Sequence, residues 1–215
     1  MKNHKIPDTL MLSNRIGAFK YEHLITRDGE QRYFCNKLKE DSEHRQYKGQ
    51  WHAKTEKKDG LGIMFWPDGV KYEGQFKDGF MCGYGRKIFV NGEYYEGFFA
   101  EDKANGVGVF RDLNGGRYEG EWKDDRQHGK GTEVWSNGKE KYSGDFFEGK
   151  KNGKGRFEWS DHSYYEGDFV DGLFEGVGVY YFKSSDKTYT GTFVGGRIEG
   201  EGEMRWGDGR EYYGQ

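Results

Sequence analysis

The sequence has little proline, little cysteine and no long apolar run. Its 215 residues include 2 prolines and 2 cysteines, and hydrophobic residues make up 33% of the chain. Cys35 and Cys82 cannot form a disulfide framework or a zinc site by themselves. A helix that crosses a bilayer needs roughly 18–20 consecutive apolar residues, and no run in the sequence approaches that length. The N-terminus also lacks the apolar segment and cleavage site of a secretory signal. We therefore expect an intracellular protein without structural disulfides.

The shortage of apolar residues would by itself favour a disordered chain. Charged residues account for 33% of the sequence, and the mean hydropathy is −1.09. However, the chain contains 16 Tyr, 16 Phe, 6 Trp and 36 Gly. Abundant aromatic residues and glycine with almost no proline are typical of β-structure with tight turns. The net charge of −3 and the pI of about 6.1 argue against nucleic acid as the main partner.

Two short motifs recur in register along most of the chain. The first, Tyr-x-Gly-x-aromatic, starts at Tyr47 and returns every 23–25 residues until a shortened copy at Tyr212. The second, Gly-x-Gly, follows each repeat tyrosine after 11 residues, or after 13 in the first copy. Asn-Gly and Asp-Gly pairs separate the motifs and favour hairpin turns. The pattern predicts a meander of short strands, each antiparallel to its neighbours.

The alternation of a β-strand assigns the motif residues to one face of the sheet. The tyrosine, the glycine and the second aromatic residue of the first motif share this face, and so do both glycines of the second motif. We expect the glycines to leave hollows in which rings from neighbouring strands lie. Burying one ring removes roughly 150–250 Å² from water, so about two rings per repeat could hold a thin sheet together without a second layer.

The copies, such as YEGEWKDDRQHGKG at residues 118–131, resemble MORN repeats (membrane occupation and recognition nexus). The resemblance covers residues 47–215 and implies an elongated, twisted, single-layer antiparallel sheet. We therefore predict an all-β meander of about seven tandem hairpins of 23 residues each. Family members occur in cytoskeletal and membrane-linked structures, including radial-spoke heads and other axonemal assemblies. The sequence lacks the usual turn glycine at 161–163 and 185–187, where we expect irregular loops.

The predicted organisation has three parts. Residues 1–16 show no pattern and are predicted to form a flexible arm. Residues 17–46 are interpreted as a degenerate hairpin and a loop that cap the first repeat, because the terminal unit of a repeat array must be atypical. Residues 47–215 are predicted to form the repeat domain, with seven full repeats and a terminal half repeat.

The sequence predicts no catalytic, cofactor or metal site. The Gly-x-Gly pairs lack the third glycine of a dinucleotide fingerprint and the Gly-Lys-Ser/Thr of a P-loop. The six histidines are scattered, without ligand spacing or a nearby nucleophile. We therefore expect a protein that is not an enzyme and needs no cofactor.

Candidate partner-binding residues lie on the face opposite the tyrosines. This face is apolar in some repeats and charged in others, and exposed apolar patches mark interfaces. The alternative is that neighbouring side chains cover these patches. The shortened last copy would leave an open strand edge, which predicts end-to-end pairing with another MORN protein. The candidate residues are Leu61, Ile63, Phe65, Val107, Val109, Val177, Val179, Tyr181, Tyr212 and Tyr213.

The predicted function is that of a non-catalytic structural adaptor that binds other proteins of a large intracellular assembly. The resemblance points to a cytoskeletal, radial-spoke-like assembly in a cilium or axoneme. The alternative is a membrane-apposed tether that binds phosphoinositides. The charge pattern gives lipid little support, because the repeat with the densest basic residues, 142–164, also holds acidic residues in equal number.

Overall fold

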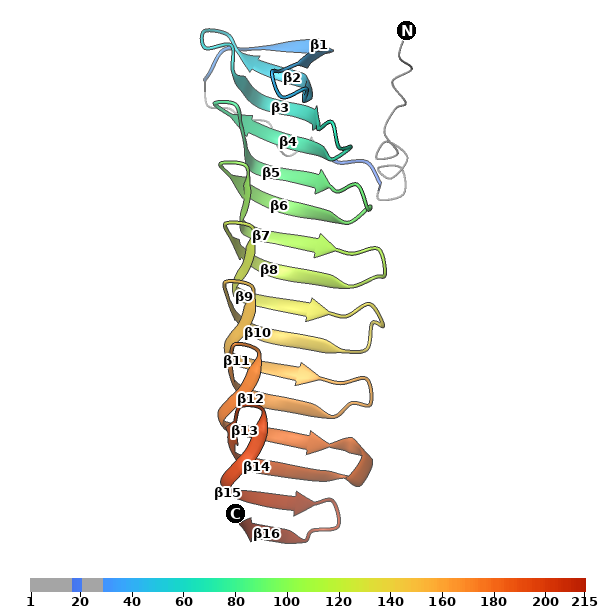
Figure 1. Cartoon of the computed structure of the whole chain (residues 1–215), viewed down its shortest axis with the longest axis vertical. Coiled ribbons are helices and arrows are strands. Elements are labelled where there is room, and N and C mark those ends of the chain that lie inside the picture. The colour runs from blue at the N-terminus through green and yellow to red at the C-terminus, as the bar shows by residue number, and fades with distance from the viewer. Residues whose placement is uncertain (1–16, 21–28) are drawn as a thin grey trace. The chain divides into compact units, whose positions relative to one another are not determined.

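The computed structural model describes residues 17–20 and 29–215 (Figure 1). The chain divides into two compact units, residues 1–113 and 114–215. The first unit contains β1 (Arg32–Glu40), β2 (Gln46–His52), β3 (Lys58–Phe65), β4 (Lys71–Lys77), β5 (Phe80–Ile88), β6 (Tyr94–Ala100) and β7 (Lys103–Arg111). The second contains β8 (Arg117–Lys123), β9 (Arg126–Val134), β10 (Lys141–Phe147), β11 (Lys150–Glu158), β12 (Tyr164–Val170), β13 (Leu173–Phe182), β14 (Lys187–Val194), β15 (Arg197–Trp206) and β16 (Glu211–Gly214).

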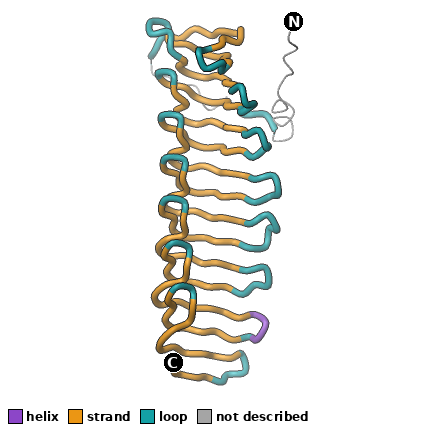
Figure 2. Tube along the Cα trace, viewed as in Figure 1, coloured by secondary structure: helices purple, strands orange, loops and turns teal. Residues whose placement is uncertain are grey.

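Within each unit every strand pairs with the next in antiparallel orientation. Among the described residues the only helical element is a single 3-10 turn, Lys183–Ser185. In each unit the turns that follow Gly-x-Gly strands lie on one side of the sheet, at one end of the strands. The turns that follow tyrosine strands lie on the other side, at the opposite end (Figure 2). The predicted all-β, single-layer antiparallel meander is confirmed.

The register aligns glycines of successive strands. Gly144 of β10 lies opposite both Gly131 of β9 and Gly155 of β11, and Gly155 lies opposite Gly167 of β12. The ring of Tyr142 stands over this row, because a Cβ atom on Gly155 would lie only 2.4 Å from the Tyr142 hydroxyl oxygen. The same arrangement recurs at Tyr47 over Gly62, Tyr72 over Gly85, Tyr95 over Gly108, Tyr118 over Gly131, Tyr165 over Gly178 and Tyr189 over Gly202.

The rings on this side, termed the tyrosine face, touch one another edge to face. Tyr142 lies 5.1 Å from Phe146 and 4.9 Å from Phe169, measured between ring centroids. Tyr165 continues the row with Phe169 at 5.3 Å and Phe193 at 4.9 Å. Each such pair contributes about 0.5–1.5 kcal/mol beyond its buried area. The expectation that rings fill glycine hollows is confirmed, and these rings form the core of the second unit.

The first glycine of each Gly-x-Gly pair has a role that differs from the prediction. Gly153 has φ +103°, and the pairing of β10 with β11 shifts register at this point. A Cβ atom on Gly153 would meet the Asp145 side chain and no tyrosine ring. The first glycine therefore forms a β-bulge, and only the second lies beneath a ring.

The turns without the usual glycine behave differently from each other. His162 has φ +68° and occupies the place that Gly69, with φ +95°, has in the turn after β3. Both turns close with the same backbone hydrogen bond, 2.9 Å long, from the amide of the preceding tryptophan. The expected irregular loop at 161–163 is therefore wrong. At 185–187 the chain does deviate, because the 3-10 turn precedes Asp186 at φ +43°.

The segment before the first repeat ends in a single strand. β1 pairs with β2, and Cys35 lies opposite Gly49. Residues 17–20 form no strand, whereas the predicted arm 1–16 and residues 21–28 of the predicted hairpin lie outside the described residues. The loop between β1 and β2 is confined to 41–45.

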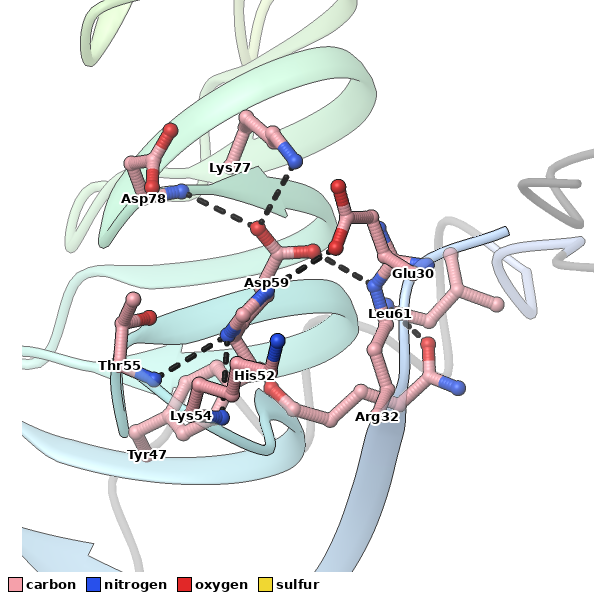
Figure 3. A network of polar contacts seen from close by, with 11 residues as sticks. Glu30, Arg32, Tyr47, His52, Lys54, Thr55, Asp59, Leu61, Lys77 and Asp78 are labelled. Carbon is pink, nitrogen blue, oxygen red and sulfur yellow. Dashed lines mark hydrogen bonds and ion pairs between the residues drawn. The ribbon is translucent and has the colours of Figure 1, made fainter. Parts of the chain in front are cut away.

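A buried carboxylate fastens β1 to the repeats. Asp59 of β3 is fully buried and accepts a hydrogen bond of 2.5 Å from Nε of Arg32 in β1 (Figure 3). Its other oxygen lies 3.4 Å from Nζ of Lys77 and accepts a hydrogen bond from the backbone amide of Asp78. Because a buried charge is costly without partners, this network makes β1 dependent on Asp59.

Candidate functional site

The candidate interaction surface is the side of the sheet opposite the tyrosine face, here termed the open face. It is formed by the residues that flank the aligned glycines, such as Arg156 of β11, Glu166 of β12 and Val179 of β13, which lie opposite one another in register. Glycine contributes no side chain to either face. A shallow hollow of about 670 Å³ therefore crosses the open face of the second unit, lined in part by these residues.

The predicted partner-binding residues do not gather at one place. Val107 and Val109 lie on β7 of the first unit, and Val177, Val179 and Tyr181 lie on β13 of the second. Val107 and Val177 are 59% and 66% exposed, whereas Val109, Val179 and Tyr181 are half-buried by their neighbours.

The other candidates differ in exposure and in the face they occupy. Leu61, Ile63 and Phe65 of β3 are half-buried. Tyr212 and Tyr213 of β16 are exposed but lie on opposite faces. Tyr212 lies against Gly214 as the other repeat tyrosines lie on their glycines, and Tyr213 donates a hydrogen bond of 2.6 Å to Glu203.

Three cations on the open face of the second unit are held in ion pairs. Arg156 donates to Glu166 at 3.0 Å, and Lys154 donates to Asp168 at 2.7 Å. The Arg156 guanidinium also lies 3.6 Å from the centre of the Tyr164 ring. One repeat earlier, Lys130 pairs with Asp145 at 2.6 Å. These three pairs therefore place matched charges close to the exposed Val177.

The open face of the first unit is partly covered by the chain itself. The ring of Phe19 is 7% exposed and stacks on Tyr84 of β5 at 6.1 Å between centroids. Arg86 of β5 donates from Nη1 to the Gly17 carbonyl at 2.8 Å and pairs with Glu96 of β6 at 2.6 Å. Burial and the neighbouring Glu96 charge raise the pKa of Tyr84 to about 12. The sequence analysis missed this contact, because Gly-Ala-Phe-Lys carries no pattern that marks a docked segment.

Metal binding, thiol chemistry and membrane insertion depend on distinct features of the described residues. Within them, no group of three or more His, Cys, Asp or Glu side chains could hold a metal ion. Cys35 and Cys82 are free thiols, both half-buried. In the same part of the chain there is no helix long and apolar enough to span a membrane.

A family model described as the MORN repeat matches seven segments of the chain: 57–71, 72–94, 95–117, 118–140, 142–164, 165–187 and 189–209. All but the first of these segments begin at a repeat tyrosine. No curated protein sequence matches the chain.

Solved structures similar to the chain include the TCP domain of Drosophila melanogaster SAS-4 (dCPAP), bound to a proline-rich motif of Ana2 (dSTIL). It is 11% identical, with a TM-score of 0.46 over 73% of this chain and 85% of that domain. The wild-type TCP10 domain of Danio rerio CPAP is 12% identical, with a TM-score of 0.26 over 80% of this chain and 78% of that one. Similarities of this size carry no information about function.

Proposed function

The chain belongs to the MORN-repeat family, and we propose that it acts as a non-catalytic adaptor that binds proteins through the open face of its second unit. The tyrosine face of that unit holds the core and is occupied by ring packing. The open face carries the side chains that differ from repeat to repeat, so it is the surface that can distinguish one partner from another.

The observation that carries this proposal is the exposed Val177 beside the ion-paired side chains of the hollow. Val177 is 66% exposed and lies in the hollow beside the Arg156–Glu166 pair. An apolar patch rimmed by polar groups is typical of a protein interface. An electrostatic lipid site requires roughly 4–8 clustered Lys or Arg side chains, and Lys130, Lys154 and Arg156 in the hollow are each paired with a carboxylate.

We further propose that the adaptor serves a cytoskeletal, radial-spoke-like assembly in a cilium or axoneme, a setting supported by the family resemblance. Pairing with another MORN protein along β16 belongs to the same proposal. Light scattering of a chain shortened to Arg205 tests the pairing. The proposal expects a smaller assembly than the full chain forms, and an unchanged oligomeric state would contradict it.

Co-purification from the native cell tests the adaptor itself. Val177→Asp places a charge on the patch, and Val90→Asp is a matched control, because Val90 is 57% exposed in the turn between β5 and β6 of the first unit. We expect Val177→Asp to lose partner proteins that the control retains. Equal recovery with both variants would show that the open face of the second unit is not the interface.

Vesicle flotation separates the adaptor from a lipid tether. The chain is mixed with vesicles of neutral lipid alone or with added phosphoinositide. The adaptor proposal expects the chain to remain in the bottom fraction in both cases. Flotation that requires phosphoinositide would favour the tether.

A further inference from the structure

The surface that receives Phe19 in the first unit has a second copy in the other unit. Arg86, Tyr94 and Glu96 of β5 and β6 recur as Arg156, Tyr164 and Glu166 of β11 and β12, each 70 positions later. The next strand follows the same spacing, because Val107 and Val109 of β7 correspond to Val177 and Val179 of β13.

The two copies also agree in geometry. Arg86 lies opposite Glu96 in register as Arg156 lies opposite Glu166. In both copies the arginine is ion-paired with that glutamate, at 2.6 Å and 3.0 Å. The guanidinium faces the tyrosine ring in both, at 5.7 Å from Tyr94 and at 3.6 Å from Tyr164.

The copies differ in what contacts the arginine. Arg86 donates to the carbonyl of Gly17 and lies 5.6 Å from the Phe19 ring, so its side chain is only 9% exposed. The side chains of Arg156 and Glu166 are 42% and 61% exposed. Arg156 therefore has donors that face solvent where Arg86 binds a peptide carbonyl.

We propose that the second copy binds an extended segment of a partner protein as the first copy binds residues 17–20 of this chain. The chemistry of the segment follows from the copy that is occupied. It presents a backbone carbonyl to Arg156 and, two residues later, an aromatic side chain to the guanidinium. This inference rests on the proposed adaptor function and specifies the chemistry of its partner.

The differences between the copies refine the partner further. Tyr84 and Phe98 of the first unit are replaced by Lys154 and Asp168 in the second. The aromatic side chain then meets the Lys154 side chain in place of the Tyr84 ring. Asp168 and Glu166 are already ion-paired with Lys154 and Arg156, so they set no preference for the charge of the next residue. The expected segment is extended, with a free backbone carbonyl two residues before an aromatic residue.

A labelled peptide with the sequence of residues 14–23 is the probe, and its binding to the full chain is followed by fluorescence anisotropy. We expect one saturable site per chain. Arg156→Gln should weaken binding by about tenfold or more, because a charge-assisted hydrogen bond is lost. Arg86→Gln is the matched control and should not weaken it. A control peptide with alanine in place of Phe19 should bind as weakly as the wild-type peptide binds the Arg156→Gln variant.

Stoichiometry gives a second readout. Phe19→Ala in the full chain releases the first copy, so the peptide should then occupy two sites, and adding Arg156→Gln should return the number to one. The absence of saturable binding, or binding that Arg156→Gln leaves unchanged, would overturn the inference. Arg156-dependent binding of phosphoinositide vesicles in place of the peptide would overturn it as well. If the peptide fails while Val177→Asp still loses native partners, the adaptor stands and this partner chemistry is wrong.

Discussion

Replacing Gly155 by alanine tests the ring-on-glycine packing in the second unit. The added Cβ would lie 2.4 Å from the Tyr142 hydroxyl oxygen and 2.5 Å from a carbon of the same ring. Tyr142 is fully buried, and its hydroxyl donates to the Asp145 carbonyl at 2.9 Å. The ring has no room to yield within the sheet, so it must leave its site or the strands must separate.

The expected cost follows from the contacts that are lost. Two edge-to-face pairs, with Phe146 and Phe169, contribute about 0.5–1.5 kcal/mol each. The hydroxyl bond adds about 1 kcal/mol, so a ring that leaves its site loses about 2–4 kcal/mol of these contacts. We therefore expect Gly155→Ala to lower the free energy of unfolding of the second unit by about 2–4 kcal/mol.

A double-mutant cycle isolates the cause. In a Tyr142→Ala background the ring is gone, so Gly155→Ala should change the free energy of unfolding by less than about 0.5 kcal/mol. Urea unfolding followed by tryptophan fluorescence measures this, because Trp135 and Trp159 pack against the same core. An equal cost of Gly155→Ala in both backgrounds would refute the packing argument.

Three further predictions concern single residues. Asp59→Asn leaves Arg32 without its buried charged partner, so β1 should lose amide-exchange protection and the free energy of unfolding of the first unit should fall by on the order of 3–5 kcal/mol. The control Asp208→Asn should change both little, because its partner Arg210 is exposed. Unchanged protection of β1 in Asp59→Asn would contradict the network. Tyr142→Phe keeps the ring and removes only the hydroxyl bond, so urea unfolding should show a loss of about 1 kcal/mol, and a loss as large as that of Gly155→Ala would count against the ring as the main contributor. Burial and the Asp168 charge raise the pKa of Tyr165 to about 12, above the value of about 10 for an unfolded tyrosine. The stability that this phenol contributes is therefore complete below a pH of about 10 and is lost as the pH rises towards 12. Urea titrations at rising pH should show that the stability of Tyr165→Phe is less sensitive to alkali than that of the unaltered chain.

Much of the repeat architecture could be predicted from the sequence. The period of two along a strand places Tyr142 and Gly144 on one face, and the same holds for the corresponding tyrosine and glycine of every other copy. The two glycines of a Gly-x-Gly pair were assigned one role because alternation alone cannot distinguish a bulge from a hollow. Gly153 takes the bulge through its positive φ, whereas Gly155 lies beneath the ring. The turn at His162 was also misjudged, because the lack of glycine there led us to expect an irregular loop. His162 adopts the positive φ that glycine has in most of the corresponding turns, so the turn is regular.

The candidate site could be predicted only in part. Strand alternation correctly put Val177 on an exposed face. The contact of Gly17 and Phe19 with β5 joins residues more than 60 positions apart and leaves no periodic trace in the sequence. The pairing of Arg156 with Glu166 required the cross-strand register, which motif spacing alone does not give.

The central claim is that the open face of the second unit contacts the partner protein. Site-specific photo-crosslinking in the native cell tests it most directly, with a photoreactive residue at position 177 or, as the control, at position 90 in a turn of the first unit. The expected result is a crosslink from position 177 to a distinct partner protein and none to that protein from position 90. A crosslink to the partner from position 90 alone would contradict the claim.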